Sequence, residues 1–507
     1  MRLDRREFLR RSSSIAGGFA LAPLGLGVGC AGVEKGASDA AGTARVAAPP
    51  PPFRISLAQW SLEKSLFAQK LDHLDFPLLA RRQLGLDCVE YVDQFFADKS
   101  KDTTYLGELK RRCDGEGVRS GLIMLDTAGE LAGPDAEKRK QAVEAHKAWI
   151  DAAAFLGCHS VRSNAWGEGP PDEVLKRYAE CASQLAEYSG KRGLNFILEN
   201  HGGPSSDGDW VVRLLKEVNS PWFGTLPDFG NFDDKSDPYK AIAQMMPGAR
   251  QSVSAKSERF DAAGKILDTD YDRMMKIVLD AGFRGWLGIE SEPDGGAGNG
   301  GIGAGEMQAI RWTQAALERV RAAQPVLKPL FNGRDLTGWQ KVCGGDWSIE
   351  EGGVLVARNG QDWSTNPEKT GSWLRTEREY GDFEFSLEFQ IAAPNSNSGV
   401  FIRSGLERNP AFNGYEAQIH DSAGKPASKG GPGSLYDYAA PSKNRVLPVG
   451  QWNQYRVIAR GPRIQLHLNG EQVLDVQGDR RNRGYLGLQN HDQKSVVKFR
   501  NIFLAEL

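Results

Sequence analysis

Acidic side chains in the first half of the chain follow short apolar segments that have strand character. Glu199, Asp228 and Glu290 each end such a segment. Because the carboxyl ends of parallel strands meet at one mouth of a barrel, we expect these three carboxylates to face one another. Like charges in a small volume destabilise each other unless a cation or a proton lies among them. Oxygen ligands suit Mn²⁺ or Mg²⁺, so the pattern predicts a divalent metal site.

The same strand ends carry further polar residues that could act with the metal: Gln59, Glu90, Asp126, Asn164, Asn200, His201, Lys256 and Glu292. A metal that polarises a ketone and its neighbouring hydroxyl acidifies the adjacent C–H bond. We expect Glu290, Glu199 or His201 to accept that proton. Lys256 would stabilise the oxyanion or pair with a carboxylate, and Asn164 and Glu292 would contact the substrate.

Eight strand-like segments position these residues. They are 55–62, 88–93, 121–125, 160–166, 196–201, 224–229, 252–257 and 286–291. Amphipathic helical patterns, such as residues 136–157 and 172–193, separate them. Eight such units over about 270 residues predict a (β/α)8 TIM barrel, because a doubly wound sheet rarely needs eight regular units. His73 and His146 fall on helical patterns and are expected to be solvated, whereas His159 is expected to be structural.

Four motifs in this half resemble the sugar phosphate isomerase/epimerase family, the xylose isomerase-like TIM barrels. They are ILENHGG (197–203), TLPDFGNF (225–232), SAKS (254–257) and GIESEP (288–293). The resemblance implies a divalent metal, Mn²⁺ or Mg²⁺ with Zn²⁺ or Co²⁺ as alternatives, bound by Glu199, Asp228 and Glu290. Ser254 stands where the family often has a metal-binding histidine. Water, substrate or His201 would then complete the site, and the alternative is a barrel that only binds sugar.

The hydrophobic period changes from helical to two after about residue 326. Residues 383–391 alternate apolar side chains on one face, and residues 463–476 read as two strands around Asn469-Gly470, a type I′ hairpin signal. Further strand patterns follow and long helical patterns are absent. The second half is therefore predicted to be an all-β sandwich or jelly roll.

Six motifs in the second half resemble the 3-keto-disaccharide hydrolase domain. They are LFNGRDLTGW (330–339), NSGVFIR (397–403), GYEAQIHD (414–421), SLYDY (434–438), WNQYRVIARGPRIQLHLNG (452–470) and GYLGLQNH (484–491). The resemblance spans 330–507 and implies a concanavalin-like jelly roll. It also implies lyase, hydratase or hydrolase chemistry on 3-keto-glycosides.

A ketone at C3 of a sugar acidifies the C2 proton, so the C1 substituent can leave by β-elimination. The reaction needs a base, an enolate stabiliser and an acid for the leaving group. Glu416, Asp421 and His491 are the candidate catalytic residues, and Arg403, Gln418 and Tyr436 the candidate substrate contacts. Glu416, Gln418 and His420 alternate onto one strand face. The alternative is a domain that binds sugar without cleaving it.

The N-terminal residues have the pattern of an export signal peptide. Arg5-Arg6-Glu7-Phe8-Leu9 resembles the twin-arginine signal, and an apolar run over 15–28 follows it. Lipidation at Cys30 would be the only membrane attachment. The predicted divisions are a signal peptide over 1–32, an Ala/Gly/Pro linker over 33–52, the barrel over 53–325 and the sandwich over 326–507. The twin-arginine export machinery is then a partner, and the location is periplasmic or exported.

Composition excludes several other functions. Lys and Arg number 63 and Asp and Glu number 65, which gives a formal net charge of −2. Nucleic-acid binding needs a clustered basic excess and is not expected. The cysteines show no C-x-x-C spacing, so no zinc ribbon or redox motif is indicated. We therefore expect an exported carbohydrate-active enzyme. The alternatives are a non-catalytic exported sugar-binding protein, or a sugar isomerase or epimerase with a C-terminal sugar-binding domain.

Overall fold

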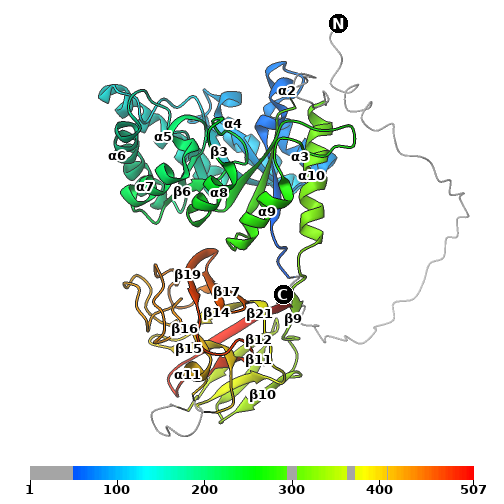
Figure 1. Cartoon of the computed structure of the whole chain (residues 1–507), viewed down its shortest axis with the longest axis vertical. Coiled ribbons are helices and arrows are strands. Elements are labelled where there is room, and N and C mark those ends of the chain that lie inside the picture. Colours follow the sequence, from blue (N-terminus) through cyan, green and yellow to red (C-terminus); the bar gives the residue numbers. More distant parts are fainter. Residues whose placement is uncertain (1–48, 294–304, 362–370, 408) are drawn as a thin grey trace, which may run out of the picture. The chain divides into compact units, whose positions relative to one another are not determined.

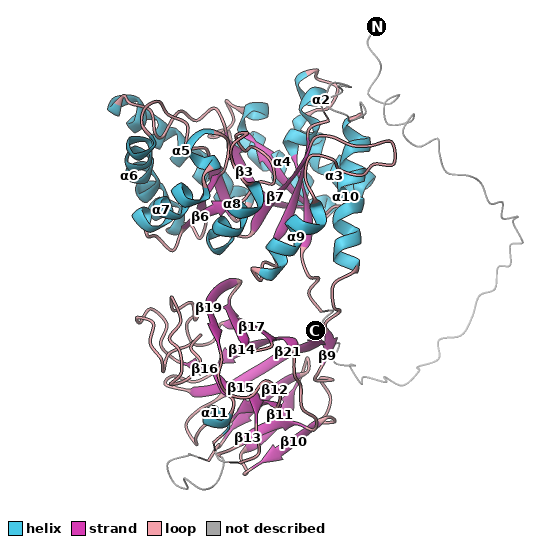
Figure 2. Ribbon diagram, in the orientation of Figure 1, coloured by secondary structure: helices cyan, strands magenta, loops and turns pink. Residues whose placement is uncertain are grey.

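A computed structural model describes residues 49–293, 305–361, 371–407 and 409–507. The predicted export signal, Cys30 and nearly all of the linker lie outside these residues. The described chain forms a parallel barrel followed by an antiparallel sandwich (Figures 1 and 2), which confirms the predicted fold class. None of the helices within the described ranges has the length and apolarity that crossing a membrane would require.

All eight predicted barrel strands form. Their bounds are β1 Arg54–Ala58, β2 Cys88–Val92, β3 Arg119–Leu125, β4 Ser160–Ser163, β5 Asn195–Glu199, β6 Phe223–Leu226, β7 Ser252–Ser257 and β8 Trp286–Ser291. The strands pair in parallel in the order β6-β5-β4-β3-β2-β1-β8-β7. Isolated parallel bridges from Thr225 to Ala249 and from Asp228 to Ser254 link β6 to β7 and close the barrel.

Helices surround the strands of the barrel (Figure 2). The α-helices are α2 Glu63–Phe67, α3 Phe76–Leu84, α4 Thr103–Glu116, α5 Ala136–Leu156, α6 Pro171–Gly190, α7 Gly208–Val218, α8 Pro238–Met245, α9 Tyr271–Asp280 and α10 Glu306–Ala322. Short 3-10 helices, numbered η1 to η5, lie at Gln59–Leu62, His73–Asp75, Asp93–Phe96, Gly203–Ser206 and Met246–Gly248. Asp135 caps the first turn of α5 by accepting from the amides of Glu137 and Lys138. Gly157 ends that helix at a φ of 80°.

Several predicted strand segments extend past the observed strands at their carboxyl ends. The segment 55–62 ends as a strand at Ala58 and continues as the 3-10 helix η1, and the segment 160–166 ends at Ser163. Polar residues at these ends turn the chain out of the sheet toward the following helix. The turns place these side chains at the mouth of the barrel.

Two antiparallel sheets form the sandwich. One contains β10 Trp339–Val342, β13 Trp373–Thr376, β20 Tyr485–Gln489, β15 Asn397–Ser404 and β16 Tyr415–His420, paired in that order. The other contains β11 Asp346–Glu350, β12 Val354–Arg358, β21 Val497–Glu506, β14 Phe383–Ile391, β17 Trp452–Arg460, β18 Arg463–Leu468 and β19 Glu471–Gln477. The short strand β9 Lys328–Pro329 pairs with β21, and one short helix, α11 Pro410–Asn413, precedes β16. The predicted 469–470 hairpin joins β18 to β19, with φ values of 53° and 82°.

Strand alternation decides which side chains of β16 enter the sandwich core. Tyr415, Ala417 and Ile419 belong to the core cluster to which both sheets contribute. Glu416 and Gln418 therefore face away from that core, as the alternation predicted. They are nevertheless buried, which means that other side chains cover this outer face.

The prediction that His73 and His146 are solvated is wrong. Their exposed fractions are 6% and 2%. His73 accepts or donates a hydrogen bond with the hydroxyl of Tyr105 at 2.8 Å and stacks on Phe96. His146 Nδ1 lies 2.8 Å from the carbonyl oxygen of Ala142, one turn earlier in α5. Local partners satisfy one ring nitrogen of each, so both rings can pack inside.

Candidate functional site

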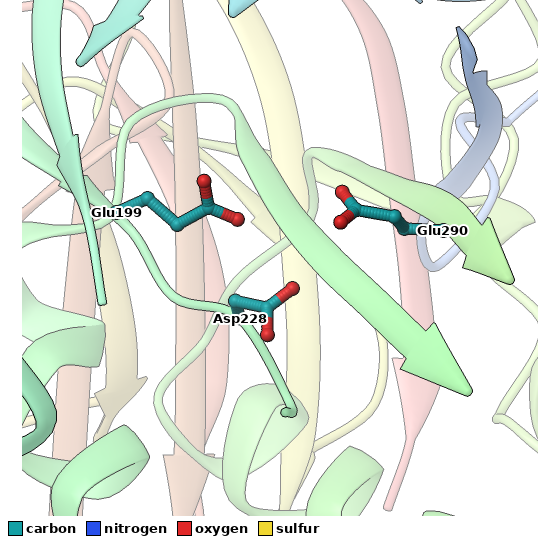
Figure 3. A group of neighbouring side chains, drawn as sticks. All are labelled: Glu199, Asp228 and Glu290. Atoms are coloured by element: carbon teal, nitrogen blue, oxygen red, sulfur yellow. The ribbon is translucent and has the colours of Figure 1, made fainter. Parts of the chain in front are cut away.

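Three buried carboxylates converge in the barrel mouth. Glu199 ends β5, Asp228 follows β6 and Glu290 lies in β8, and one oxygen of each lies within 4.8 Å of the others. Figure 3 shows the three side chains directed into a common space. Their exposed fractions are 0%, 0% and 3%. The sequence predicted this convergence from the strand ends.

The donor set fits a divalent cation. Both carboxylate oxygens of Glu199 and Oδ2 of Asp228 are buried without a hydrogen-bond partner within the described part of the chain. Burial raises the pKa of Glu199 and Asp228, and the negative charge of Glu290 adds to this effect. A cation among the three would supply the missing partners and reverse the pKa shifts.

Arg162, which the sequence analysis did not single out, lies directly beside this triad. Its Nε is 2.6 Å from Glu199 Oε2, without the alignment of a hydrogen bond, and its Nη1 donates to Asp126 Oδ1 at 2.6 Å. Burial alone would lower the pKa of Arg162, but Glu199 and Asp126 hold it above its usual value. The available signal in the sequence was the position of this arginine inside a predicted barrel strand, because arginine is rarely buried without a partner.

Lys256 and Ser254 contact the triad from β7. Lys256 Nζ lies 3.3 Å from Glu290 Oε1 and 2.5 Å from Glu292 Oε1. Ser254 Oγ donates to Glu290 Oε2 at 3.2 Å, so the residue that stands in the expected histidine position does touch the predicted metal ligands. The site thus holds two cationic side chains, Arg162 and Lys256. They stand against five carboxyl groups, those of Glu199, Asp228, Glu290, Glu292 and Asp126. The excess of negative charge can accommodate a divalent cation.

His201 and Asn164 lie on the β4–β5 side of the mouth. Asn164 Nδ2 donates to Asp126 Oδ1 at 3.0 Å. The His201 ring stands edge to face with Trp166, with ring centroids 5.5 Å apart. Burial lowers the pKa of His201, and the positive charges of Arg162 and Lys256 lower it further. His201 is therefore neutral near pH 7 and able to accept a proton.

Glu90 is a fourth buried carboxyl group, on β2, and stands apart from the triad. Its Oε1 accepts from Ser56 Oγ at 2.8 Å and from Ser252 Oγ at 3.2 Å. Burial raises the pKa of Glu90 to about 7. Its serine partners distinguish it from Glu199, whose oxygens have no hydrogen-bond donor among the described residues.

In the sandwich, Glu416 is a buried carboxyl group on the outer face of the β15–β16 sheet. Burial raises its pKa to about 8, so it is largely protonated at neutral pH. When the Gln418 amide is oriented to satisfy both of its ends, it donates to Glu416 Oε1 at 3.1 Å and to the Ser398 carbonyl at 2.9 Å. A protonated carboxyl group in such a setting can act as a general acid.

Two histidines belong to the same sheet region: His420 ends β16, and His491 follows β20. His420 shares the face of Glu416, and its pKa is lowered by burial, by Lys425 and by the charge of His491. His491 Nδ1 lies 2.7 Å from Oδ2 of Asp492, the next residue in the chain. Asp492 was not among the site residues predicted from the sequence. Asp492 is itself fixed by the amides of Lys494 and Ser495. A carboxylate on Nδ1 orients the ring and leaves Nε2 as the basic nitrogen.

Tyr436 is connected to Glu416 by a backbone hydrogen bond. Its amide donates to the Glu416 carbonyl at 2.8 Å, and its ring lies edge to face with Phe412 at 6.1 Å. Phe412 is half exposed, so the two rings form an accessible aromatic wall beside the acid. Such a wall suits the apolar face of a sugar ring.

Arg403 and Asp421 have other partners. The Arg403 side chain is fully buried and donates to the carbonyls of Gly381 and Gly461 and to Asp382. Three of its donors thus meet acceptors of the protein itself, which supports a structural role for Arg403, and the predicted substrate contact stays a prediction. Asp421 Oδ2 accepts from the Asn395 amide at 2.8 Å and thereby holds the loop before β15.

Two models of known protein families match this chain, one in each domain. Residues 78–322 match the family model described as xylose isomerase-like TIM barrel. Residues 327–505 match the 3-keto-alpha-glucoside-1,2-lyase-like domain. Each of the two domains thus matches one family model. The xylose isomerase-like barrel contains the acidic triad, and the lyase-like sandwich contains Glu416 and His491. Both resemblances inferred from the sequence are confirmed, and the protein is carbohydrate-active.

Several solved structures are similar to parts of this chain. A candidate glycosyl hydrolase from Parabacteroides distasonis is 26% identical over 36% of this chain and 94% of its own, with a TM-score of 0.30. D-psicose 3-epimerase from Clostridium cellulolyticum is 17% identical over 53% of this chain and 99% of its own, with a TM-score of 0.42. The IOLI protein with a binding zinc atom is 13% identical over 53% of this chain and 98% of its own, with a TM-score of 0.43. Among curated proteins, no sequence matches this chain.

Proposed function

We propose that this protein is an exported enzyme whose lyase-like sandwich cleaves 3-keto-glycosides. The observation that carries the proposal is Glu416, a buried carboxyl group whose pKa is raised to about 8, on the sheet that also carries the His491–Asp492 pair. Elimination needs a base and an acid of matched strength at one pH. Here burial provides the acid and Asp492 orients the base.

The roles follow from the raised pKa of Glu416 and from the contact of His491 with Asp492. His491 Nε2 takes the proton from C2, and the electrons of the C2–H bond form the enolate of the C3 ketone. As the enolate collapses, a C1–C2 double bond forms and the C1–O bond breaks. Glu416 gives its proton to the departing oxygen. The products are an enone and the free aglycone, and addition of water to the double bond would complete a net hydrolysis.

The barrel would carry related proton chemistry on keto-sugars. Glu199, Asp228 and Glu290 would hold a divalent cation, Mn²⁺ or Mg²⁺ by their oxygen donors, with Zn²⁺ or Co²⁺ as alternatives. Such an ion supplies polarisation of a ketone and its neighbouring hydroxyl when bound. His201, neutral near pH 7, accepts a proton at the mouth, and Lys256 keeps a positive charge beside Glu290.

A direct assay tests the proposal. Purified full-length protein is given a 3-keto-glucoside, and enone absorbance and released aglycone are followed over time. We expect both signals to fall in Glu416→Gln and His491→Ala but to persist in the barrel variant Glu199→Gln. If the three variants match the wild type, the site assignment is wrong. Binding of the sugar without cleavage would instead support a binding protein.

If the wild type converts a free keto-sugar without releasing any aglycone, and Glu199→Gln loses that conversion, the alternative of a sugar isomerase or epimerase with a sugar-binding sandwich is favoured. Following the conversion of a free keto-sugar separates the two cases. The lyase assignment requires aglycone release, which an isomerase cannot produce.

Export is a separate part of the proposal, supported by the twin-arginine pattern at residues 5–9. Replacement of Arg5 and Arg6 by lysine should leave the precursor in the cytoplasm, as measured by cell fractionation. Mass spectrometry of the mature protein tests lipidation, because a diacylglycerol on Cys30 adds a defined mass. An unmodified mature N-terminus beyond Cys30 would exclude the anchor.

A further inference from the structure

Three aromatic side chains gather on the β1–β2 side of the barrel, and none of them belongs to the site described above. Trp60, Phe67 and Phe95, here called the aromatic patch, come from η1, α2 and η3. Their ring centroids are 6.1 Å apart for Trp60 and Phe67, 6.0 Å for Trp60 and Phe95, and 5.0 Å for Phe67 and Phe95. All three follow the carboxyl ends of β1 and β2, on the face where barrel sites lie.

Hydrogen bonds tie the patch to the acidic triad. Ser61, next to Trp60, donates its Oγ to the Ile289 carbonyl at 2.9 Å and accepts from the Ser291 amide at 2.8 Å. These two residues flank Glu290, so one serine connects the loop that carries Trp60 with a predicted metal ligand. The patch and the triad are therefore connected at the same mouth of the barrel.

The patch also packs against apolar side chains inside the barrel. Trp60 and Phe95 pack on the apolar cluster inside the barrel, which consists of Ala58, Val92, Leu122, Met124, Ile197 and Leu226. Gln59 Oε1 accepts from the Val92 amide at 3.0 Å and joins the two supporting loops. Phe67 lies at the outer edge and is 55% exposed, whereas the triad is almost fully buried. A half-exposed phenylalanine held against two other rings is an available stacking surface.

We propose that the aromatic patch is a subsite that stacks the second ring of a disaccharide-type glycoside whose keto-sugar ring lies at the triad. Pyranose rings present apolar C–H faces, which pack on aromatic rings, and hydroxyl edges, which suit the charged groups around the triad. Phe67 lies at the exposed rim and the triad is buried, so we assign the two to different rings of one ligand. The inference rests on the proposed sugar-binding function of the barrel.

Binding of unreactive sugars to the full chain tests the subsite. Trehalose has two rings and glucose has one, and both lack the ketone that elimination needs. Saturation-transfer NMR titrations give the dissociation constant of each for the wild type, Phe67→Ser and Phe155→Ser. Phe155 is the matched control because it is a half-exposed phenylalanine on the barrel helix α5. Glu199→Gln identifies which part of the binding belongs to the barrel.

We expect Phe67→Ser to weaken trehalose binding about two- to tenfold and to leave glucose binding unchanged, while Phe155→Ser changes neither. Equal effects of the two variants, or equal effects on the two sugars, would overturn the subsite. If Phe67→Ser instead changes the oligomeric state in light scattering, the patch is a contact between copies and the inference is wrong. Sugar binding that Glu199→Gln does not affect would remove the proposed barrel function together with the subsite.

Discussion

Arg162 Nε lies 2.6 Å from Glu199 Oε2, and both side chains are buried in the barrel. The contact places a permanent cation against a carboxylate that is also a predicted metal ligand. Arg162 thus neutralises one charge of the triad, while Glu199 keeps Oε1 without a hydrogen-bond partner among the described residues. The pair offsets part of the repulsion among the three buried carboxylates.

Removing the cation should therefore destabilise the barrel. We expect Arg162→Met to lower the free energy of unfolding by about 3–5 kcal/mol, because it leaves buried carboxylates without a partner. Thermal unfolding monitored by circular dichroism measures the change. Adding Glu199→Gln to Arg162→Met should recover part of the loss, since the uncompensated charge is then gone. Additive losses in the double variant would show that the two residues do not interact.

We expect the metal content of the protein to depend on the triad. The wild type should bind Mn²⁺ or Mg²⁺ and show a higher melting temperature with the ion, because a ligand that binds only the folded state stabilises it. Glu199→Gln and Asp228→Asn should lose this binding. Glu90→Gln is the control, since Glu90 is equally buried but bonded to serines. Elemental analysis after dialysis measures the bound ion, and equal metal in all four proteins would contradict the assignment.

The raised pKa of Glu416 has a consequence for stability. Its pKa is about 8 in the folded state and near 4.5 when unfolded, so the folded protein retains a proton that the unfolded chain loses. Stability then falls as the pH rises from about 4.5 to about 8, by up to about 1.4 kcal/mol per pH unit. Glu416→Gln should lack this part of the dependence. Denaturant titrations of both proteins across that range test the difference.

The same protonation should set the rate of aglycone release. If Glu416 acts as the acid, the rate of aglycone release should decline as the pH rises through about 8. Glu416→Gln should lower the rate about 10²- to 10⁴-fold. A Glu416→Gln protein with the wild-type rate and pH profile would exclude the acid role.

Gly399 makes room for the acid. Gly399 lies on β15, beside Glu416 on β16, and a Cβ at Gly399 would overlap the Glu416 carboxyl group. Gly399→Ala should therefore displace that group and reduce the rate of aglycone release at least about tenfold, given the sensitivity of catalysis to small misplacements. Gly487→Ala, in the same sheet, would clash with Trp373 instead and is the matched control. Adding Gly399→Ala to Glu416→Gln should cause no further loss.

Much of this protein can be read from its sequence. Local periodicity predicted the eight barrel strands and the hairpin at Asn469-Gly470, because side-chain alternation and turn residues act over a few positions. The convergence of Glu199, Asp228 and Glu290 was also predictable, since parallel strands of a barrel end at one mouth. Glu416 and Gln418 could be assigned to one face by the period of two alone.

Only the tertiary structure decided what these groups touch. The contact of Arg162 with Glu199 and the space that Gly399 leaves for Glu416 depend on pairing between neighbouring strands, which no local pattern specifies. Arg403 belongs to a motif from which a substrate contact was predicted. Its side chain is nevertheless fully buried, and it donates to three acceptors of the protein. A sequence thus states which charges a strand carries, whereas register and packing determine which are compensated and which remain free to react.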